Sequence, residues 1–261
     1  TLAGLESALD AGKRFNVQVI PGVEVSIRFK RDYLTGTLHL LLYFPPDRLS
    51  DETFTGTLGR ILAGGRGDSL VRARIAEINR VFGPGKPMAM LERDMVFEDI
   101  SSLSSQASRR HFAMALEQTF NIMDKEAINT IIGNASPAYL PSGIELSDIA
   151  GFIRDNHLVV SLAHPAAGSF PGEGHYREVL PPVETVERLL PEFLDAGLNG
   201  LEVYYPGHTE AHEALMLEWA DRYGLIVTGG SDCHDTDHRP FGVRGLSEPL
   251  TRRVTDYLLE V

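Results

Sequence analysis

The sequence is poor in cysteine and in positive charge. Its 261 residues include a single cysteine, Cys233, so no disulfide can form within the chain. This fits a reducing compartment, and we expect a cytoplasmic protein. The 24 Lys and Arg residues face 36 Asp and Glu residues, which gives a formal net charge of -12. Such a chain has no broad cationic surface for a phosphate backbone, so we expect no duplex nucleic acid as a partner.

Two further absences narrow the class of protein. No apolar run approaches the roughly 20 residues of a membrane-spanning helix, and no signal peptide is evident, so we expect no membrane partner. No G-x-S-x-G sequence occurs, which argues against a serine nucleophile on a nucleophile elbow. The remaining composition, 43% hydrophobic and 23% charged, is that of a globular domain or of a domain with an insertion.

Strand and helix patterns alternate in both outer parts of the chain but not in its middle. Apolar strand patterns occupy residues 17–27, 35–44, 158–163, 200–205 and 225–228. The middle of the chain instead carries successive helical patterns. We therefore expect an α/β domain made of residues 1–49 and 142–261, with a mainly helical cap subdomain inserted at 50–141. Strand–helix alternation predicts a parallel sheet or barrel whose site lies at the carboxyl edge of the strands.

Residues 225–238, LIVTGGSDCHDTDH, combine a buried strand pattern with a candidate half-site for a metal. Side chains two residues apart in an extended chain point the same way, so Asp232 and His234 share one face and Cys233 points away. A carboxylate beside an imidazole suits a transition metal. The alternative is a turn with an incidental Asp and His.

Other strand patterns carry residues of the same two types. Glu24 lies between two valines that are expected to be buried, where a carboxylate needs a partner, or else it is an exposed residue of an edge strand. His39 is the one polar centre of an apolar strand, a position more typical of a hydrogen-bonded core residue. His164, Glu202 and His208 also lie in or just after strand patterns. Convergence at one mouth would create mixed His and carboxylate sites suited to zinc, manganese or iron.

The helix expected at residues 109–120 begins with Arg109, Arg110 and His111. A cationic helix start opposes the helix dipole, a small cost that a bound anion would remove. Arg110 could hold a phosphate in a fork, and His111 could donate to the phosphate or protonate the leaving oxygen. The alternative is a basic helix start that faces solvent.

Seven motifs, in this order, resemble the PHP (polymerase and histidinol phosphatase) family of metal-dependent phosphoesterases, in the branch with an inserted helical subdomain. They are GVEVS (22–26), LHLLLYF (38–44), RRHFAMAL (109–116), PAYLP (137–141), LAHP (162–165), GLEVYYPGH (200–208) and GGSDCH (229–234). The resemblance implies a distorted barrel of seven β/α units, (β/α)7, whose site holds two or three divalent metal ions: manganese, zinc or iron.

The resemblance also implies roles for individual residues. Glu24 would bridge two metals, with His39 and His164 completing one of the two sites. Asp232 and His234 would bind two different metals and take part in catalysis. His111 would act in catalysis and, with Arg110 and His208, contact the substrate. The role of Glu202 stays open.

The sequence also departs from the family pattern. Relatives begin with a His-x-His strand and an Asp-His-Asp-Thr strand, whereas this sequence starts at Thr1, where the second motif would end. We therefore expect an N-terminally incomplete barrel that holds fewer ions, of which the ion shared by Glu24, His39 and His164 is retained. Ser136 also replaces a Lys found in some relatives.

These observations predict a phosphoesterase that uses a metal-activated water on a small phosphate ester, such as a nucleotide or the end of a short oligonucleotide. Two alternatives remain open. One is an amidohydrolase-type enzyme that cleaves carbon–nitrogen bonds, against which Arg110 and His111 argue. The other is a metal-poor, non-catalytic binding module.

Overall fold

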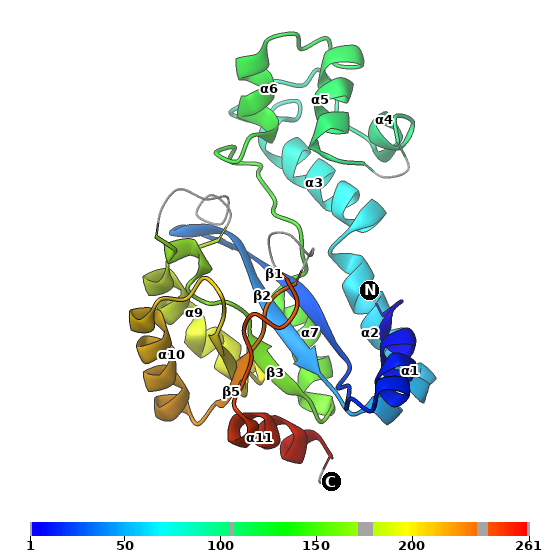
Figure 1. Cartoon of the computed structure of the whole chain (residues 1–261). Helices are drawn as coiled ribbons and strands as arrows, with labels where there is room; N and C mark the ends of the chain where they lie inside the picture. Colours follow the sequence, from blue (N-terminus) through cyan, green and yellow to red (C-terminus); the bar gives the residue numbers. More distant parts are fainter. Residues whose placement is uncertain (1, 105–106, 172–179, 234–239, 260–261) are drawn as a thin grey trace. The chain divides into compact units, whose positions relative to one another are not determined.

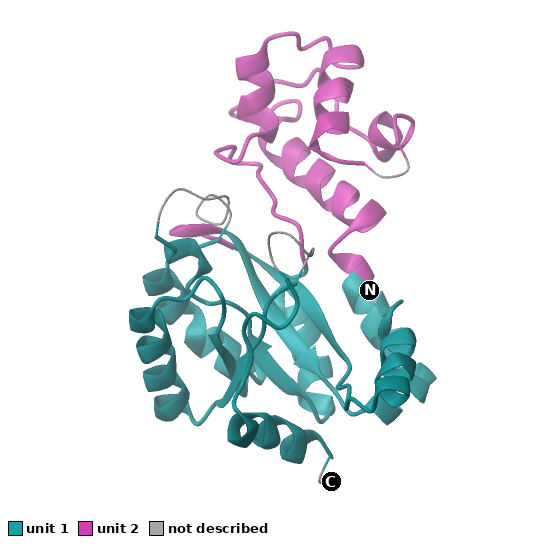
Figure 2. Ribbon diagram, viewed as in Figure 1, with its two compact units in different colours: residues 1–29, 36–62, 144–261 teal, residues 30–35, 63–143 magenta. Residues whose placement is uncertain are grey.

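The computed structural model describes residues 2–104, 107–171, 180–233 and 240–259. The chain divides into two compact units (Figure 2). The first unit comprises residues 1–29, 36–62 and 144–261, and the second comprises residues 30–35 and 63–143.

The first unit is a mixed α/β structure built around one sheet (Figure 1). Its strands are β1 (Gly22–Arg31), β2 (Leu34–Tyr43), β3 (Val159–Leu162), β4 (Gly200–Tyr204) and β5 (Ile226–Gly229), and the tip of the β1–β2 hairpin belongs to the second unit. Its helices are α1 (Leu5–Phe15), η1 (Pro46–Ser50), α2 (Glu52–Gly64), α7 (Leu146–Asp155), η2 (Ala167–Ser169), α9 (Val183–Ala196), α10 (Glu210–Tyr223) and α11 (Glu248–Leu259), of which α2 ends in the second unit. The predicted α/β class is therefore confirmed.

The sheet is mixed rather than parallel throughout, which corrects the expectation of a parallel sheet. Its strand order is β1-β2-β3-β4-β5. Strand β2 runs antiparallel to β3, with Leu40 opposite Leu162, whereas β3, β4 and β5 are parallel. Only two residues link β1 to β2, and so short a link joins antiparallel neighbours, because parallel neighbours need a crossover of a dozen residues or more.

Alternating burial in β1 and β2 decides which side chains face the site. In β1, Val23, Val25 and Ile27 are buried, and Glu24 points to the other face. The same alternation in β2 buries Leu38, Leu40 and Leu42 and turns His39 toward the side of Glu24. The expected orientation of Glu24 is thus confirmed. The separate strand that was expected before the Pro21-Gly22 break is absent, since residues 17–21 are irregular and β1 begins at Gly22.

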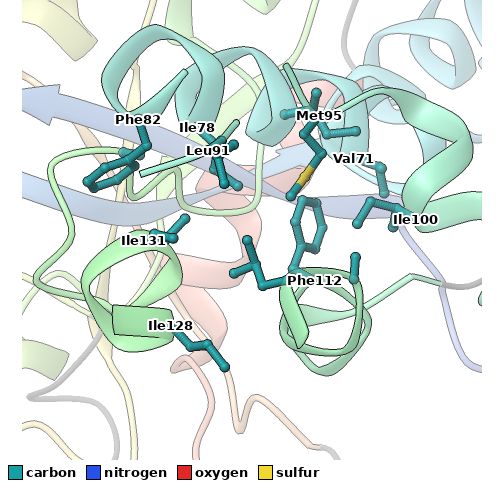
Figure 3. Close-up of a cluster of buried hydrophobic side chains, with 13 residues drawn as sticks. Val71, Ile78, Phe82, Leu91, Met95, Ile100, Phe112, Ile128 and Ile131 are labelled. Carbon is teal, nitrogen blue, oxygen red and sulfur yellow. The ribbon is translucent and has the colours of Figure 1, made fainter. Parts of the chain in front are cut away.

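The second unit is helical and has its own core. Its helices are α3 (Gly67–Phe82), α4 (Phe97–Ser101), α5 (Arg109–Gln118) and α6 (Lys125–Ile132). Side chains such as Phe82, Ile100 and Phe112 fill its interior (Figure 3). The tip of the β1–β2 hairpin is held in this unit by Lys30, whose Nζ lies 2.6 Å from Oε2 of Glu77.

The helical unit comprises residues 30–35 and 63–143, rather than the expected range of 50–141. Residues 50–62 belong to the first unit. The reason is Phe54 of α2, whose ring centroid lies 5.0 Å from those of both Phe44 and Phe152. Among the helices described, none is both long and apolar enough to cross a membrane.

Candidate metal centre

Three of the predicted metal ligands meet in the first unit. Glu24 comes from β1, His39 from β2, and His164 from the turn that follows β3. The pairing of β2 with β3 brings the two histidines together, since the N–H of Ala163 donates to the carbonyl of His39 at 2.9 Å. One ligand atom from each of the three side chains lies within 4.8 Å of the other two.

The spacing and chemistry of these atoms fit a divalent metal ion. Oε1 of Glu24 lies 2.7 Å from Nδ1 of His39 and 3.5 Å from Nε2 of His164, and the two nitrogens are 3.2 Å apart. Ligands about 2.1 Å from a shared ion lie roughly 3.0–3.4 Å from one another in octahedral or tetrahedral geometry. One carboxylate and two imidazoles form a donor set that suits zinc, manganese or iron.

The electrostatics of the cluster keep Glu24 charged. Burial by itself raises the pKa of Glu24, but its hydrogen bonds with His164 and His39 outweigh burial and bring that pKa well below its usual range. A permanently ionised carboxylate is the form that binds a metal. The two imidazole rings stand almost perpendicular, at 86°, so their nitrogens approach the carboxylate from different directions.

His164 is held in an unusual backbone conformation by a buried carboxylate. Its φ of 30° lies in the left-handed region, which residues other than glycine adopt uncommonly. The N–H of His164 donates to Oε2 of Glu202 at 2.7 Å, and the side chain of Glu202 is buried. Glu202, whose role the sequence left open, therefore contacts the backbone of a candidate ligand.

The pKa of the buried Glu202 is displaced in the opposite direction to that of Glu24. Its pKa is raised to about 8, mainly by burial and also by the nearby charges of Asp232 and Glu24, while the hydrogen bond from the His164 N–H lowers it in part. Oε1 of Glu202 is close to Gly230, because a Cβ at that glycine would lie 3.4 Å from it. Glu202 thus lies between the ends of β3 and β5, and the negative charges of Asp232 and Glu24 nearby favour its neutral form.

Asp232 follows β5 and contacts a residue that the sequence did not single out. Its carboxylate accepts a hydrogen bond at 3.0 Å from the hydroxyl of Tyr205, whose ring centroid lies 5.3 Å from that of His164. Burial and the charge of Asp232 raise the pKa of Tyr205, which keeps it a donor. Tyr205 comes directly after β4. The sequence position therefore suggests that Tyr205 belongs to the site, but it does not identify Asp232 as the partner of its hydroxyl.

Asp232 does not join the three-ligand cluster within the described part of the chain. Its expected neighbour His234 lies outside the described residues, so the predicted pairing of Asp232 with His234 stays a prediction. The metal-binding and catalytic roles of both residues are predictions for the same reason.

His208 is a neutral, buried imidazole beside this region. Its Nδ1 donates to the carbonyl of Val203 at 2.7 Å, which leaves Nε2 with its lone pair. Burial is the main cause that lowers the pKa of His208 to about 4. Among the described residues, Nε2 has no hydrogen-bond partner although it is buried. His208 can therefore accept a hydrogen bond from a ligand, rather than attract an anion by charge.

The two predicted phosphate contacts lie in the second unit, at the start of α5. Nδ1 of His111 accepts a hydrogen bond from the N–H of Ser108 at 2.9 Å. A neutral His111 therefore carries its proton on Nε2, which can donate to an anion. Arg110 is exposed. The expectation that both side chains face the metal ligands concerns two separate units and stays a prediction.

Comparison with curated proteins finds phosphodiester-cleaving relatives. No family model matches the chain. The chain is 27% identical over 239 residues to a phosphoribosyl 1,2-cyclic phosphate 1,2-diphosphodiesterase from Eggerthella lenta, covering 90% of this chain and 79% of the relative. It is 23% identical over 241 residues to a 5'-3' exoribonuclease from Haemophilus influenzae, covering 90% of this chain and 76% of that protein.

Two solved structures have a similar fold. A metal-dependent phosphoesterase from Bifidobacterium adolescentis matches with a TM-score of 0.56 and 19% identity over 98% of this chain and 82% of that chain. An amidohydrolase from Chromobacterium violaceum, solved with bound sulfate and no metal, matches with a TM-score of 0.52 and 23% identity over 99% of this chain and 84% of that one. At these identities the two likenesses establish the fold alone.

Proposed function

We propose that this chain cleaves a small phosphorylated substrate, such as a nucleotide or the end of a short oligonucleotide. The chain is a hydrolase of phosphate esters and is similar to a diphosphodiesterase over 90% of its length. The observation that carries the proposal is the convergence of Glu24, His39 and His164 on one point. The two curated relatives support the substrate class, since one is named for a cyclic phosphate and the other for RNA.

Glu24, His39 and His164 would hold a divalent ion, and Asp232 with His234 would contribute to the binding of further ions. Such an ion supplies a Lewis acid and lowers the pKa of a coordinated water. The residues of the chain then have separate tasks. Glu24 stays ionised, Glu202 holds the backbone of His164, and Tyr205 orients the carboxylate of Asp232.

Substrate contacts are proposed from three residues. Arg110 would bind two phosphate oxygens in a fork. His111 would donate from Nε2, the nitrogen that its contact with Ser108 leaves protonated. His208 would accept a hydrogen bond from a substrate hydroxyl, because its Nε2 keeps a lone pair.

The test combines metal analysis with an assay of phosphate release. We expect the purified chain to retain divalent metal after dialysis against metal-free buffer, and to lose its release of phosphate from a nucleotide panel when a chelator removes that metal. The variant Glu24→Gln keeps the shape of the side chain but loses its charge, so it should lose both properties. Metal binding and phosphate release that are unchanged in Glu24→Gln would refute the proposed centre.

The finer fold is proposed on the same basis. We infer a distorted barrel of seven β/α units with a helical cap. The support for this inference is the parallel half of the sheet, in which β3, β4 and β5 are followed by α9, α10 and α11.

An amidohydrolase-type activity is the second candidate, because one structural neighbour is an amidohydrolase. Adding small amides to the substrate panel decides between the two reactions. Metal-dependent cleavage of amides without phosphate release would favour the carbon–nitrogen hydrolase. A chain that binds no metal and cleaves neither class would be a binding module.

A further inference from the structure

The second unit contains an open pocket of about 60 Å³. Its walls come from α3, α5, α6 and residues 138–140, all within that unit. Ile78, Phe112 and Ile131 belong both to these walls and to the core of the unit (Figure 3). The floor of the pocket is therefore part of the apolar core of this unit.

The pocket has the size of one flat ring. One water needs about 10–15 Å³ when space is measured by the positions open to its centre, so 60 Å³ corresponds to roughly four to six waters. That volume accommodates a single aromatic ring but not a whole nucleotide. A larger ligand could place only its ring inside, with the rest of the molecule at the opening.

The charged side chains at the pocket are both cationic. Arg109 donates to Oδ1 of Asn129 at 3.2 Å and to Oδ1 of Asn134 at 3.3 Å. Both partners are neutral, so these bonds orient the guanidinium without cancelling its charge. Nε of Arg74 donates to the carbonyl of Leu140 at 3.1 Å. None of the described residues that line the pocket is acidic, although the chain carries a net charge of -12.

An apolar ring site beside oriented guanidinium groups matches one kind of ligand: a flat ring joined to an anionic group. Phe112 and Tyr139 line the pocket and offer aromatic contacts to such a ring, and guanidinium groups also stack on bases. We propose that this pocket binds the base of a nucleotide, with the phosphate on the side of Arg109. The proposal rests on the proposed function only for the choice of a phosphorylated ligand.

The test measures binding to the whole chain by calorimetry in a chelator, without metal. The probes are uridine 5'-monophosphate, whose base is a single ring, and ribose 5-phosphate, which has the phosphate but lacks the base. We expect the nucleotide to bind at least tenfold more tightly, or about 1.4 kcal/mol. Equal affinities, or no detectable binding of the nucleotide, would overturn the proposal.

Variants locate the binding. Ile132→Glu places a carboxylate at the partly buried rim of the pocket, and Arg109→Gln removes the charge from an exposed position. Each should weaken nucleotide binding tenfold or more. Arg80→Gln is the matched control, because Arg80 is an exposed arginine of the same unit outside the pocket, and it should stay within twofold.

Thermal unfolding followed by circular dichroism checks that each variant is folded. Should Ile132→Glu fail to fold, Arg109→Gln decides the matter alone. If the folded pocket variants bind the nucleotide with unchanged affinity, the proposal that the base binds in this pocket is refuted. If the chain binds the nucleotide through these residues but releases no phosphate with any metal, the proposed pocket stands and the proposed function is refuted.

Discussion

The two halves of the sheet present their polar residues in different ways. In the β1–β2 hairpin, Glu24 and His39 lie inside regular strands and reach the site through the alternation of side chains alone. In the parallel half, His164 and Asp232 follow β3 and β5 and have φ angles of 30° and 46°. Such left-handed conformations cost about 1–3 kcal/mol each outside glycine.

The difference shows where each half of the site is vulnerable. The hairpin residues are oriented by a buried apolar face behind them, which includes Val25 and Leu40. The residues of the parallel half depend on individual polar contacts: Glu202 binds the N–H of His164, and Tyr205 binds the carboxylate of Asp232. Loss of one such contact should therefore affect the parallel half without affecting the hairpin.

The largest effect is expected from the ligands themselves, one from each half. His39→Ala and His164→Ala should each lower kcat/KM at least about a hundredfold, because changes in the residues that merely support metal ligands already cost about 10–100-fold. Thr37→Ala is the matched control, since Thr37 lies two residues before His39 on the same face of β2. A loss confined to one of the two histidines would contradict a site shared by both halves.

The second prediction separates the halves. Glu202→Leu should weaken metal binding about 10–100-fold, because it leaves the buried N–H of His164 without its acceptor. Glu202→Gln keeps an oxygen acceptor and should retain most of the affinity. The metal affinity of each variant is measured by titrating the metal into the protein in a calorimeter.

The hairpin provides the control for this prediction. Ser26→Ala changes a residue two positions after Glu24 on the same face of β1, and it should leave metal affinity unchanged. Equal losses in Glu202→Leu and Glu202→Gln would show that the hydrogen bond to His164 is not what supports the site.

The smallest effect is a pH dependence of stability in the parallel half. The pKa of His208 is lowered from 6.5 to about 4 in the folded chain, so the unfolded chain binds more protons between these values. Stability should therefore rise with pH from about 4 to 6.5 and stay level above that range. Urea unfolding at pH 5 and pH 7.5 should differ by about 1–2 kcal/mol more in the unmodified chain than in His208→Gln. The same difference in both chains would show that His208 is not the group responsible.

Much of the hairpin could be predicted from its sequence. The alternation from Val23 to Ile27 correctly placed Glu24 on the face opposite the core. The antiparallel direction of β2 was missed, although the short link between β1 and β2 carried the signal. The contacts of Glu202 and Tyr205 could not be predicted, because a buried acid or a strand-end tyrosine has no local pattern that identifies its partner.

The sequence by itself determined which side chains of β1 and β2 are apolar and which are polar, since a strand repeats every two residues. Only the tertiary structure decided that His39 and His164, separated by 125 residues, approach within 3.2 Å. That approach requires β2 to pair with β3 in one register, with Leu40 opposite Leu162. Register is a property of two distant segments together, because the hydrogen bonds that set it form between them and within neither.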